Sequence, residues 1–143
     1  AEEIRVYSAT SRNGEAELSE KLMLVEQTGA SLYIGLMFDR DEDPEKFGSY
    51  VCYSSRYYRP WLTNGSFADR MERELVTAIQ GRAMGLVEVE EGVLRELSIP
   101  AAVICPGYLS HETEGELLLR EDYQDKIAAG ISSGILTTFE ELE

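Results

Sequence analysis

In the first half of the chain, hydrophobic residues recur with two different spacings, one typical of strands and one typical of helices. Residues 4–8 alternate as a short strand does, and the turn pair Asn13-Gly14 follows them. Apolar residues then recur at helical spacing and lead to a glycine suited to a helix C-cap: Leu18, Leu22, Val25 and Gly29. Residues 32–38 are apolar on both faces, which indicates an interior strand of a parallel sheet. The charged residues 39–46 predict a loop, and residues 50–53 predict a further strand.

The second half of the chain shows the same alternation of patterns. Residues 56–65 form an aromatic and basic loop, after which Ser66 and Asp69 have the spacing of a capping box that starts a helix. Apolar residues four apart then share one helix face: Phe67, Met71, Leu75 and Ile79. An acidic connector over residues 81–92 leads to a buried strand at 100–105 and a tight turn. A long closing helix carries its own apolar stripe: Ile127, Ile131, Ile135 and Phe139.

Strands therefore alternate with helices along the chain, and no internal repeat interrupts them. This order predicts an α/β fold with a mostly parallel sheet flanked by helices. A chain of 143 residues is long enough for one domain with a proper core and too short for two comfortable ones. We expect a single domain over residues 1–143.

The composition of the chain mainly argues against certain kinds of binding partner. Thirteen basic and 27 acidic side chains give a formal charge of −14, which disfavours binding to nucleic acid or to anionic lipid. No apolar run approaches the roughly 18 residues that a membrane span needs, so we expect no membrane insertion. The two cysteines, Cys52 and Cys105, are too few for a disulfide scaffold and lack zinc-type spacing.

Several short motifs follow one another in a recognisable order. They are a helix over 15–30, the strand Leu32-Tyr33-Ile34, a Gly-led strand at 48–53, Val93-Leu94-Arg95, the Pro-Ala strand at 100–105, Gly107-Tyr108-Leu109-Ser110-His111, and a closing helix with Tyr123-Gln124. In this order the chain resembles the zinc-dependent N-acetylmuramoyl-L-alanine amidases, which cut bacterial cell wall. The resemblance implies an amidase-like, phosphorylase/hydrolase-like three-layer sandwich and an extracytoplasmic location, in the periplasm or cell envelope.

The resemblance also assigns catalytic positions, and this chain does not fill them. Such an amidase needs zinc, held by two His and one Glu, and a catalytic Glu at the end of the strand after Pro-Ala. The third ligand position falls on Met37, and the catalytic Glu position falls on Cys105. The other ligands belong to an opening strand and helix that we expect this sequence to lack. The resemblance therefore implies no zinc cofactor, no metal site and no catalytic residue here.

Three residues near these positions have alternative interpretations. Cys105 is either a nucleophile that uses His111 as its base or a buried cysteine that packs as a small hydrophobe, and the residues favour the second. Met37 is expected to fill the core rather than to bind a metal. Ser110 beside His111 resembles a hydrolase pair, but adjacent residues rarely point at one another, so we expect the pair to cap or position the following helix.

The aromatic loop is the best candidate for binding. Tyr57, Tyr58, Arg59 and Trp61 are residue types that dominate interface hot spots, although the aromatic rings could instead fold back over the sheet edge. We expect a protein partner or self-association, with peptidoglycan as a further candidate ligand.

Three functional hypotheses follow from these observations. The first is a catalytically inactive amidase-like domain that serves as a binding, scaffolding or regulatory module of the bacterial cell envelope. The second is a functional peptidoglycan amidase completed by sequence or a chain not present here. The third is an interaction subunit that exposes the sheet edge left by the absent opening strand.

Overall fold

The structure, a computed structural model, describes residues 4–11, 14–15 and 17–142. At its centre is a four-stranded sheet in the order β3 (Tyr33–Leu36), β8 (Ala101–Cys105), β4 (Ser49–Tyr53) and β7 (Ala83–Glu88). Strand β3 runs parallel to β8 and β4 runs parallel to β7, while β4 and β8 are antiparallel. The predicted mostly parallel sheet is therefore confirmed. Strand β8, the apolar run after Pro100, is its most buried strand.

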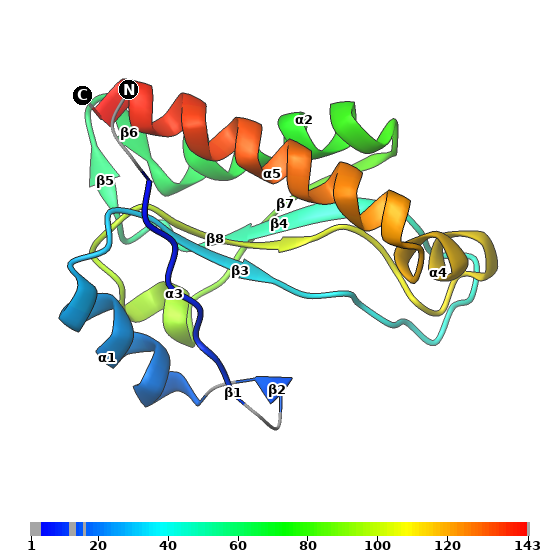
Figure 1. The fold of residues 1–143 in the computed structure, drawn as a ribbon, viewed down its shortest axis with the longest axis horizontal. Coiled ribbons are helices and arrows are strands. Elements are labelled where there is room, and N and C mark those ends of the chain that lie inside the picture. The colour runs from blue at the N-terminus through cyan, green and yellow to red at the C-terminus, as the bar shows by residue number, and fades with distance from the viewer. Residues whose placement is uncertain (1–3, 12–13, 16, 143) are drawn as a thin grey trace.

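Helices cover both faces of this sheet and complete the predicted three layers (Figure 1). Helices α2 (Asn64–Ile79) and α5 (Glu121–Leu142) lie on one face. The shorter helices α1 (Leu18–Thr28) and α3 (Val93–Glu96) lie on the other, and α4 (Glu112–Leu118) joins β8 to α5. Helix α1 ends as predicted at Gly29, whose φ of +63° is a left-handed conformation that glycine adopts without strain.

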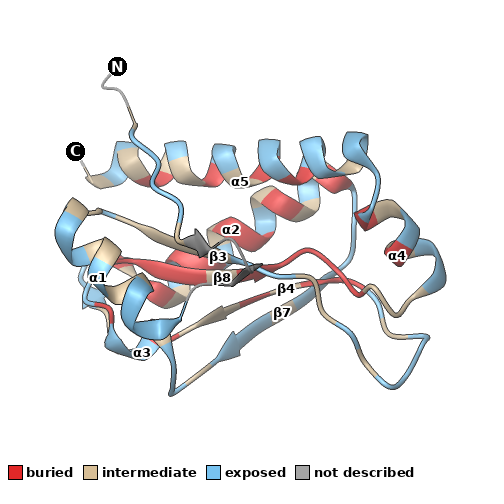
Figure 2. Ribbon diagram, turned by 60° about the horizontal axis from the view of Figure 1, so that its bottom comes forward, coloured by how far each residue is buried: buried red, intermediate tan, exposed pale blue. Residues whose placement is uncertain are grey.

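The core consists of two clusters separated by the sheet. The larger lies under α2 and α5, and Figure 2 shows the buried stripe of α2 facing the strands. The four apolar residues predicted to share that stripe are all buried: Phe67, Met71, Leu75 and Ile79. The smaller cluster lies under α1 and α3 and contains Leu94, Leu97 and Ala101.

Helix α2 packs closely on α5 because α5 carries glycine at the crossing. A Cβ added to Gly130 would lie 2.9 Å from the carbonyl oxygen of Glu74 and from the Cα of Leu75. Both of these atoms belong to the α2 backbone, which has no rotamer to change. The absence of a side chain at Gly130 therefore sets how near the two helices come.

Helix α2 begins earlier than Ser66 and Asp69 predicted. Its N-cap is Thr63, whose hydroxyl accepts the Ser66 N–H at 3.0 Å while the Ser66 hydroxyl accepts the Thr63 N–H at 3.0 Å. Serine thus fills the place that Glu or Gln usually takes in a capping box. The next residue, Asn64, is fully buried and bridges the Ser54 carbonyl and the Ala101 N–H at 2.8 and 2.9 Å.

Three other predictions about the strands are wrong. Residues 4–9 have no regular structure, and the N-terminal pairing is instead β1 (Thr10–Ser11) with β2 (Gly14–Glu15); Asn13 of the predicted turn lies outside the described residues. The acidic connector contains β7, which sequence patterning missed because this strand lies at a sheet edge and is mostly exposed. Strand β3 is the opposite edge of the described sheet, not an interior strand.

Candidate functional site

The carboxyl ends of β3 and β8 bring Met37 and Cys105 together. The parallel register pairs Leu36 with Ile104, and the Met37 N–H donates to the Ile104 carbonyl at 3.0 Å. Cys105 is the next residue along β8, so it lies level with Met37. Strand β4 on the other side of β8 places Tyr50 directly opposite Cys105. The two positions that the resemblance assigns to catalysis are thus neighbours at one end of the sheet.

Cys105 has the surroundings of a protonated thiol. Its side chain is fully buried, and its Sγ donates to the Gly107 carbonyl at 3.4 Å. Burial raises the pKa of the Cys105 thiol to about 11. At pH 7 only about one chain in ten thousand would therefore carry the reactive thiolate. The candidate base, His111, uses its Nδ1 to accept the Glu114 N–H at 3.1 Å and caps α4.

A polar cluster missed by the sequence analysis surrounds this end of the sheet. The Tyr50 hydroxyl donates to the Asp39 carboxylate, and burial together with this hydrogen bond raises the pKa of Tyr50. The ring of Tyr108 lies 6.1 Å from that of Tyr50, with Lys46 Nζ 5.6 Å above it. Lys46 also pairs with Asp41 at 3.3 Å. The only sign of this cluster in the sequence is that Asp39 is the first polar residue after an apolar strand.

One carboxylate joins the two loops that frame the cluster. Glu114, on α4, accepts the Gly48 N–H at 3.0 Å and the Tyr108 N–H at 2.7 Å. A Cβ on Gly107 would lie 2.0 Å from this carboxylate, so a side chain there would displace the Glu114 carboxylate from its present position. Ser110 adds a third tie, because its hydroxyl accepts the Asp41 N–H at 2.9 Å. His111 therefore caps the following helix, as predicted for this pair, whereas Ser110 holds the loop at Asp41 instead.

These side chains do not suit zinc. Zinc in proteins takes thiolate, imidazole and carboxylate ligands. Here Met37 offers a soft thioether, Cys105 is fully buried, and the Nδ1 of the chain's single histidine, His111, accepts the Glu114 N–H. Among the described residues, no three His, Cys, Asp or Glu side chains are grouped so as to hold a metal ion.

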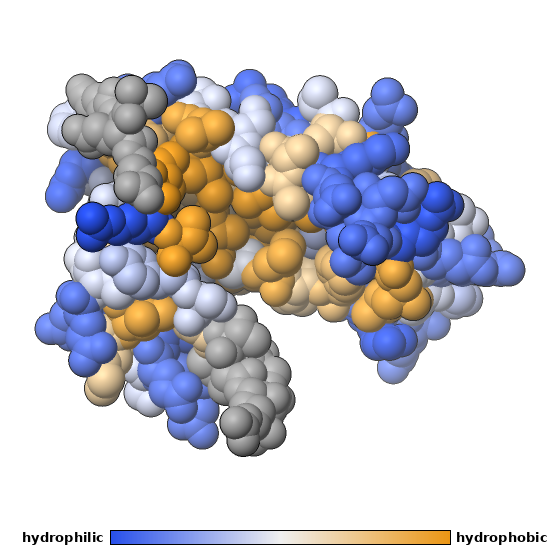
Figure 3. Space-filling view, in the orientation of Figure 1, coloured by the Kyte–Doolittle hydropathy of each residue, from blue (hydrophilic) through white to orange (hydrophobic). Residues whose placement is uncertain are grey.

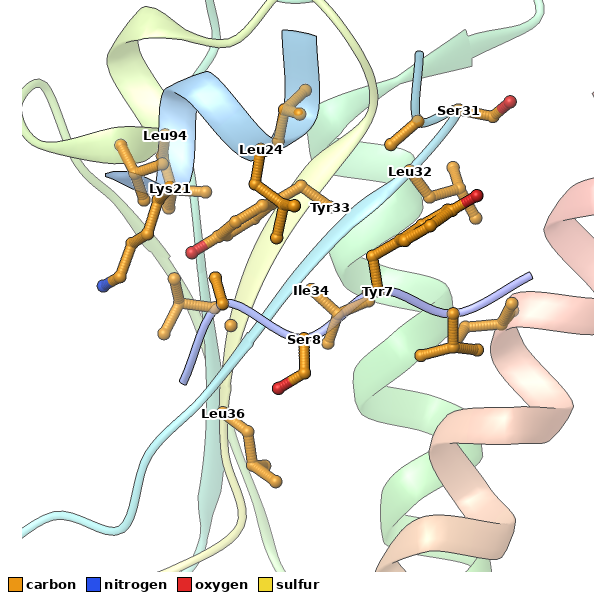
Figure 4. Close-up of a pocket in the computed structure, with 18 of the residues that line it drawn as sticks. Tyr7, Ser8, Lys21, Leu24, Ser31, Leu32, Tyr33, Ile34, Leu36 and Leu94 are labelled. Atoms are coloured by element: carbon orange, nitrogen blue, oxygen red, sulfur yellow. The ribbon is translucent and has the colours of Figure 1, made fainter. Parts of the chain in front are cut away.

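A broad groove runs along the open edge of β3. It has a volume of about 2100 Å³ and is lined by residues 4–9, by β3, by the last turns of α5 and by residues 88–95. Apolar side chains gather in this hollow, as Figure 3 shows, and Figure 4 shows Leu32, Ile34 and Leu36 of the strand region around it. Met37 lines the groove with 40% of its surface exposed, so the prediction that it fills the core is wrong.

The aromatic loop lies at the other end of the sheet. It forms a small hairpin of β5 (Tyr58–Arg59) and β6 (Leu62–Thr63), anchored by the buried Leu62. Because the hairpin follows β4, which runs antiparallel to β8, it is remote from Cys105. Tyr58 and Trp61 expose 67% and 64% of their surface, while Tyr57 is half-buried with the Arg59 guanidinium 5.4 Å above its ring. The structure therefore does not bring the two candidate sites together.

Comparison with protein sequences supports the resemblance. The family N-acetylmuramoyl-L-alanine amidase (Amidase_3) matches residues 1–137. The germination-specific N-acetylmuramoyl-L-alanine amidase of Bacillus subtilis (strain 168) is 28% identical over 133 residues, which cover 92% of this chain and 54% of that protein. An uncharacterised cell wall amidase of Bacillus anthracis is 21% identical over 139 residues, or 94% of this chain and 26% of that one. The chain thus spans about half, or less, of the length of these curated relatives.

Solved structures share the fold. The catalytic domain of CwlV, an N-acetylmuramoyl-L-alanine amidase from Bacillus (Paenibacillus) polymyxa var. colistinus, superposes with a TM-score of 0.78 at 25% identity, over 88% of this chain and 67% of that one. An N-acetylmuramoyl-L-alanine amidase from Clostridium difficile 630 gives a TM-score of 0.80 at 24% identity, over 91% and 70%. The CwlD amidase from Clostridioides difficile was solved in complex with the GerS lipoprotein. It superposes with a TM-score of 0.75 at 22% sequence identity, over 86% of this chain and 61% of that one.

Proposed function

The chain belongs to the N-acetylmuramoyl-L-alanine amidase family, and we propose that it serves in the bacterial cell envelope as a binding or regulatory module that does not hydrolyse the wall. Its fold is that of amidase catalytic domains. A fold can be kept after its catalytic site is lost, because activity depends on particular side chains placed on the scaffold.

The observation that carries this proposal is the state of Cys105. The resemblance puts the catalytic carboxylate at this position, where it would act as the general base for a zinc-activated water. A buried thiol with a pKa of about 11 keeps its own proton at neutral pH and cannot accept one from water. Loss of a general base alone costs about 10²–10⁴ in rate, and loss of the metal costs more.

Metal analysis and a wall-digestion assay test the proposal together. We expect protein purified without chelator to hold far less than one zinc per chain. We also expect no muropeptides with a free L-alanine amine above a heat-inactivated control, under conditions in which the Bacillus subtilis relative serves as a positive control. About one zinc per chain, or release of such muropeptides, would overturn the proposal.

One observation favours the competing hypothesis of a functional amidase. The chain spans 54% of the Bacillus subtilis relative and 67% of the CwlV catalytic domain, so additional sequence or another chain could supply zinc ligands. Under that hypothesis, a longer polypeptide or the missing chain restores both zinc and hydrolysis. Under our proposal neither returns, because Met37 and Cys105 stay unchanged.

A protein partner is part of the proposal. CwlD, which shares the fold, was solved in complex with a lipoprotein, which supports such a role for an amidase-like domain. The aromatic hairpin, with Tyr58 and Trp61 exposed, offers a surface for it. Peptidoglycan is the other candidate ligand, and similarity to a cell wall amidase supports an extracytoplasmic location. In the part of the chain that the structure describes, no helix combines the length and apolar character needed to cross a membrane.

A further inference from the structure

His111 closes the start of α4 through a ring nitrogen that must be unprotonated. Its Nδ1 accepts the Glu114 N–H at 3.1 Å, and its backbone carbonyl accepts the Gly115 N–H at 2.7 Å. Because a backbone N–H is a donor, the ring nitrogen that faces it is the acceptor of a neutral imidazole. Once the ring gains a second proton, both of its nitrogens are donors and neither can accept the Glu114 N–H. The side-chain cap therefore exists only while His111 is neutral.

This cap holds the helical turn that joins the two loops. Glu114 lies in the first turn of α4, and its carboxylate accepts the N–H groups of Gly48 and Tyr108. The ring of His111 also lies against the ring of Phe47, the residue before Gly48, with 5.1 Å between their centroids. Both contacts to the start of β4 thus come from this one end of α4. Loss of the cap loosens the turn and, with it, the position of the Glu114 carboxylate.

The charged groups around His111 act on its ring in both directions. Three glutamates of α4 favour an imidazolium, and two arginines oppose it. Arg40 lines the same hollow of about 270 Å³ as His111, and the Arg82 guanidinium lies 5.0 Å from the centroid of the Phe47 ring. In the loop before Phe47, Asp41 and Lys46 form an ion pair with each other at 3.3 Å. Whatever the balance of these charges, the gain of a proton removes the acceptor of the cap. The glutamates are Glu112, Glu114 and Glu116.

We propose that His111 acts as a pH-sensitive latch: when its ring gains a proton, α4 loses its N-cap and the Glu114 carboxylate releases the two loops that it joins. Histidine is the side chain that ordinarily changes charge between about pH 5 and pH 8. The two loops frame the end of the sheet that holds Cys105, so acidification opens this end and neutral pH closes it. The inference adds regulation to the proposed binding function, on which its biological use rests. Metal analysis and wall digestion do not report on α4, so the two proposals fail separately.

Nuclear magnetic resonance on the untagged chain follows the ring and the loops in one experiment. His111 is the single histidine of the chain, so its ring nitrogen signals are identified directly. We expect an unprotonated Nδ1 at the alkaline limit and two protonated ring nitrogens at the acid limit. The amide signal of Glu114 should titrate with the same midpoint as the ring. The hydrogen-exchange protection factors of Gly48 and Tyr108 should fall at least about fivefold over the same range, as expected when an N-cap acceptor is lost.

His111→Asn is the matched control. Asparagine is among the best N-cap residues and does not titrate, so this variant should keep Gly48 and Tyr108 protected down to about pH 5. His111→Ala offers no acceptor and should show low protection at every pH. The Glu114 carboxylate, whose pKa is raised by burial, is present in both variants. The comparison therefore separates protonation of the ring from protonation of this carboxylate.

Four results would overturn the proposal. One is a ring that keeps a single protonation state between about pH 5 and pH 8. Another is a Glu114 amide signal that does not follow the ring. The third is an equal loss of protection in His111→Asn and in the wild type, which would make the Glu114 carboxylate the titrating group. The fourth is full protection in His111→Ala at neutral pH. If His111→Asn does not fold, the shared midpoint of the ring and the Glu114 amide in the wild type still decides.

Discussion

Removing the Glu114 carboxylate should destabilise the end of the sheet that holds Cys105. This side chain accepts N–H groups from Gly48 and Tyr108, and both of these residues are buried. Glu114→Ala leaves both donors without a partner, and a buried unsatisfied donor costs about 1–3 kcal/mol. Because water that enters the gap can accept some of these N–H groups and so reduce the cost, we expect a loss of about 3 kcal/mol in the free energy of unfolding.

Glu114→Gln should cost less. The amide oxygen can still accept the N–H of Tyr108 and, at 3.2 Å, that of Gly48, while the NH₂ group replaces the second oxygen at 3.0 Å from Gly48 and cannot accept its N–H. One bond is kept and one is weakened, so we expect a loss of about 1 kcal/mol. Glu114→Ala should therefore be less stable than Glu114→Gln because of the hydrogen bonds. The negative charge does not explain the difference, since both variants remove it.

Urea unfolding followed by circular dichroism measures these differences. For a domain of this size, 3 kcal/mol corresponds to about 1.5 M in the urea midpoint and about 10 °C in Tm. Glu116→Ala, an exposed change on the same helix, is the matched control. If Glu114→Ala lies within about 0.5 kcal/mol of that control, the carboxylate does not hold the two loops and the reasoning fails.

Four further outcomes are expected. Burial raises the pKa of Glu72 above its ordinary value of 4.5, so the folded chain binds this proton more tightly than the unfolded chain does. The free energy of unfolding therefore falls as the pH rises above about 4.5 through the raised pKa. Glu72→Gln should flatten the resulting fall in Tm between about pH 5 and pH 7. Gly130→Ala should lower Tm, since overpacking against the α2 backbone costs about 1–3 kcal/mol and exceeds the gain of about 1 kcal/mol in helix propensity; an unchanged Tm would show that the helices separate freely. The double variant Met37→His with Cys105→Glu should release no muropeptides, and activity in this variant would refute the view that further zinc ligands are missing. Trp61→Ala should weaken self-association or partner binding by about 2 kcal/mol or more in light scattering if the hairpin anchors an interface, and a wild type that stays monomeric without a cross-linked partner counts against that role.

The parts of the fold that were predicted are those in which burial is strong. The apolar stripe of α2 and the buried run of β8 are read directly from residues such as Phe67 and Ile104, because both elements pack on the core. Strand β7 was missed for the opposite reason: as an edge strand it buries little, so its sequence shows no apolar alternation. Met37 was misplaced because an apolar residue at the end of an edge strand looks like a core residue in the sequence.

The candidate site was only partly predictable. Family resemblance identified Cys105 and Met37, but their adjacency follows from the parallel register between strands distant in the chain. The pairing of Tyr50 with Asp39 also depends on the antiparallel register between β4 and β8 and on the course of the loop after β3. Such long-range pairings leave no periodic pattern in the sequence, so no local analysis reveals them.

The central place of β8 also affects how the chain folds during synthesis. Strand β3 pairs only with β8 among the described strands, and roughly 70 residues separate the two in the chain. At 5–20 residues per second, a ribosome needs about 3–14 s to make them. During that time β3 is part of the nascent chain but still lacks its neighbouring strand. Ribosome-bound chains stalled before Ala101 should therefore be cut by protease near β3, and chains extended past α4 should resist.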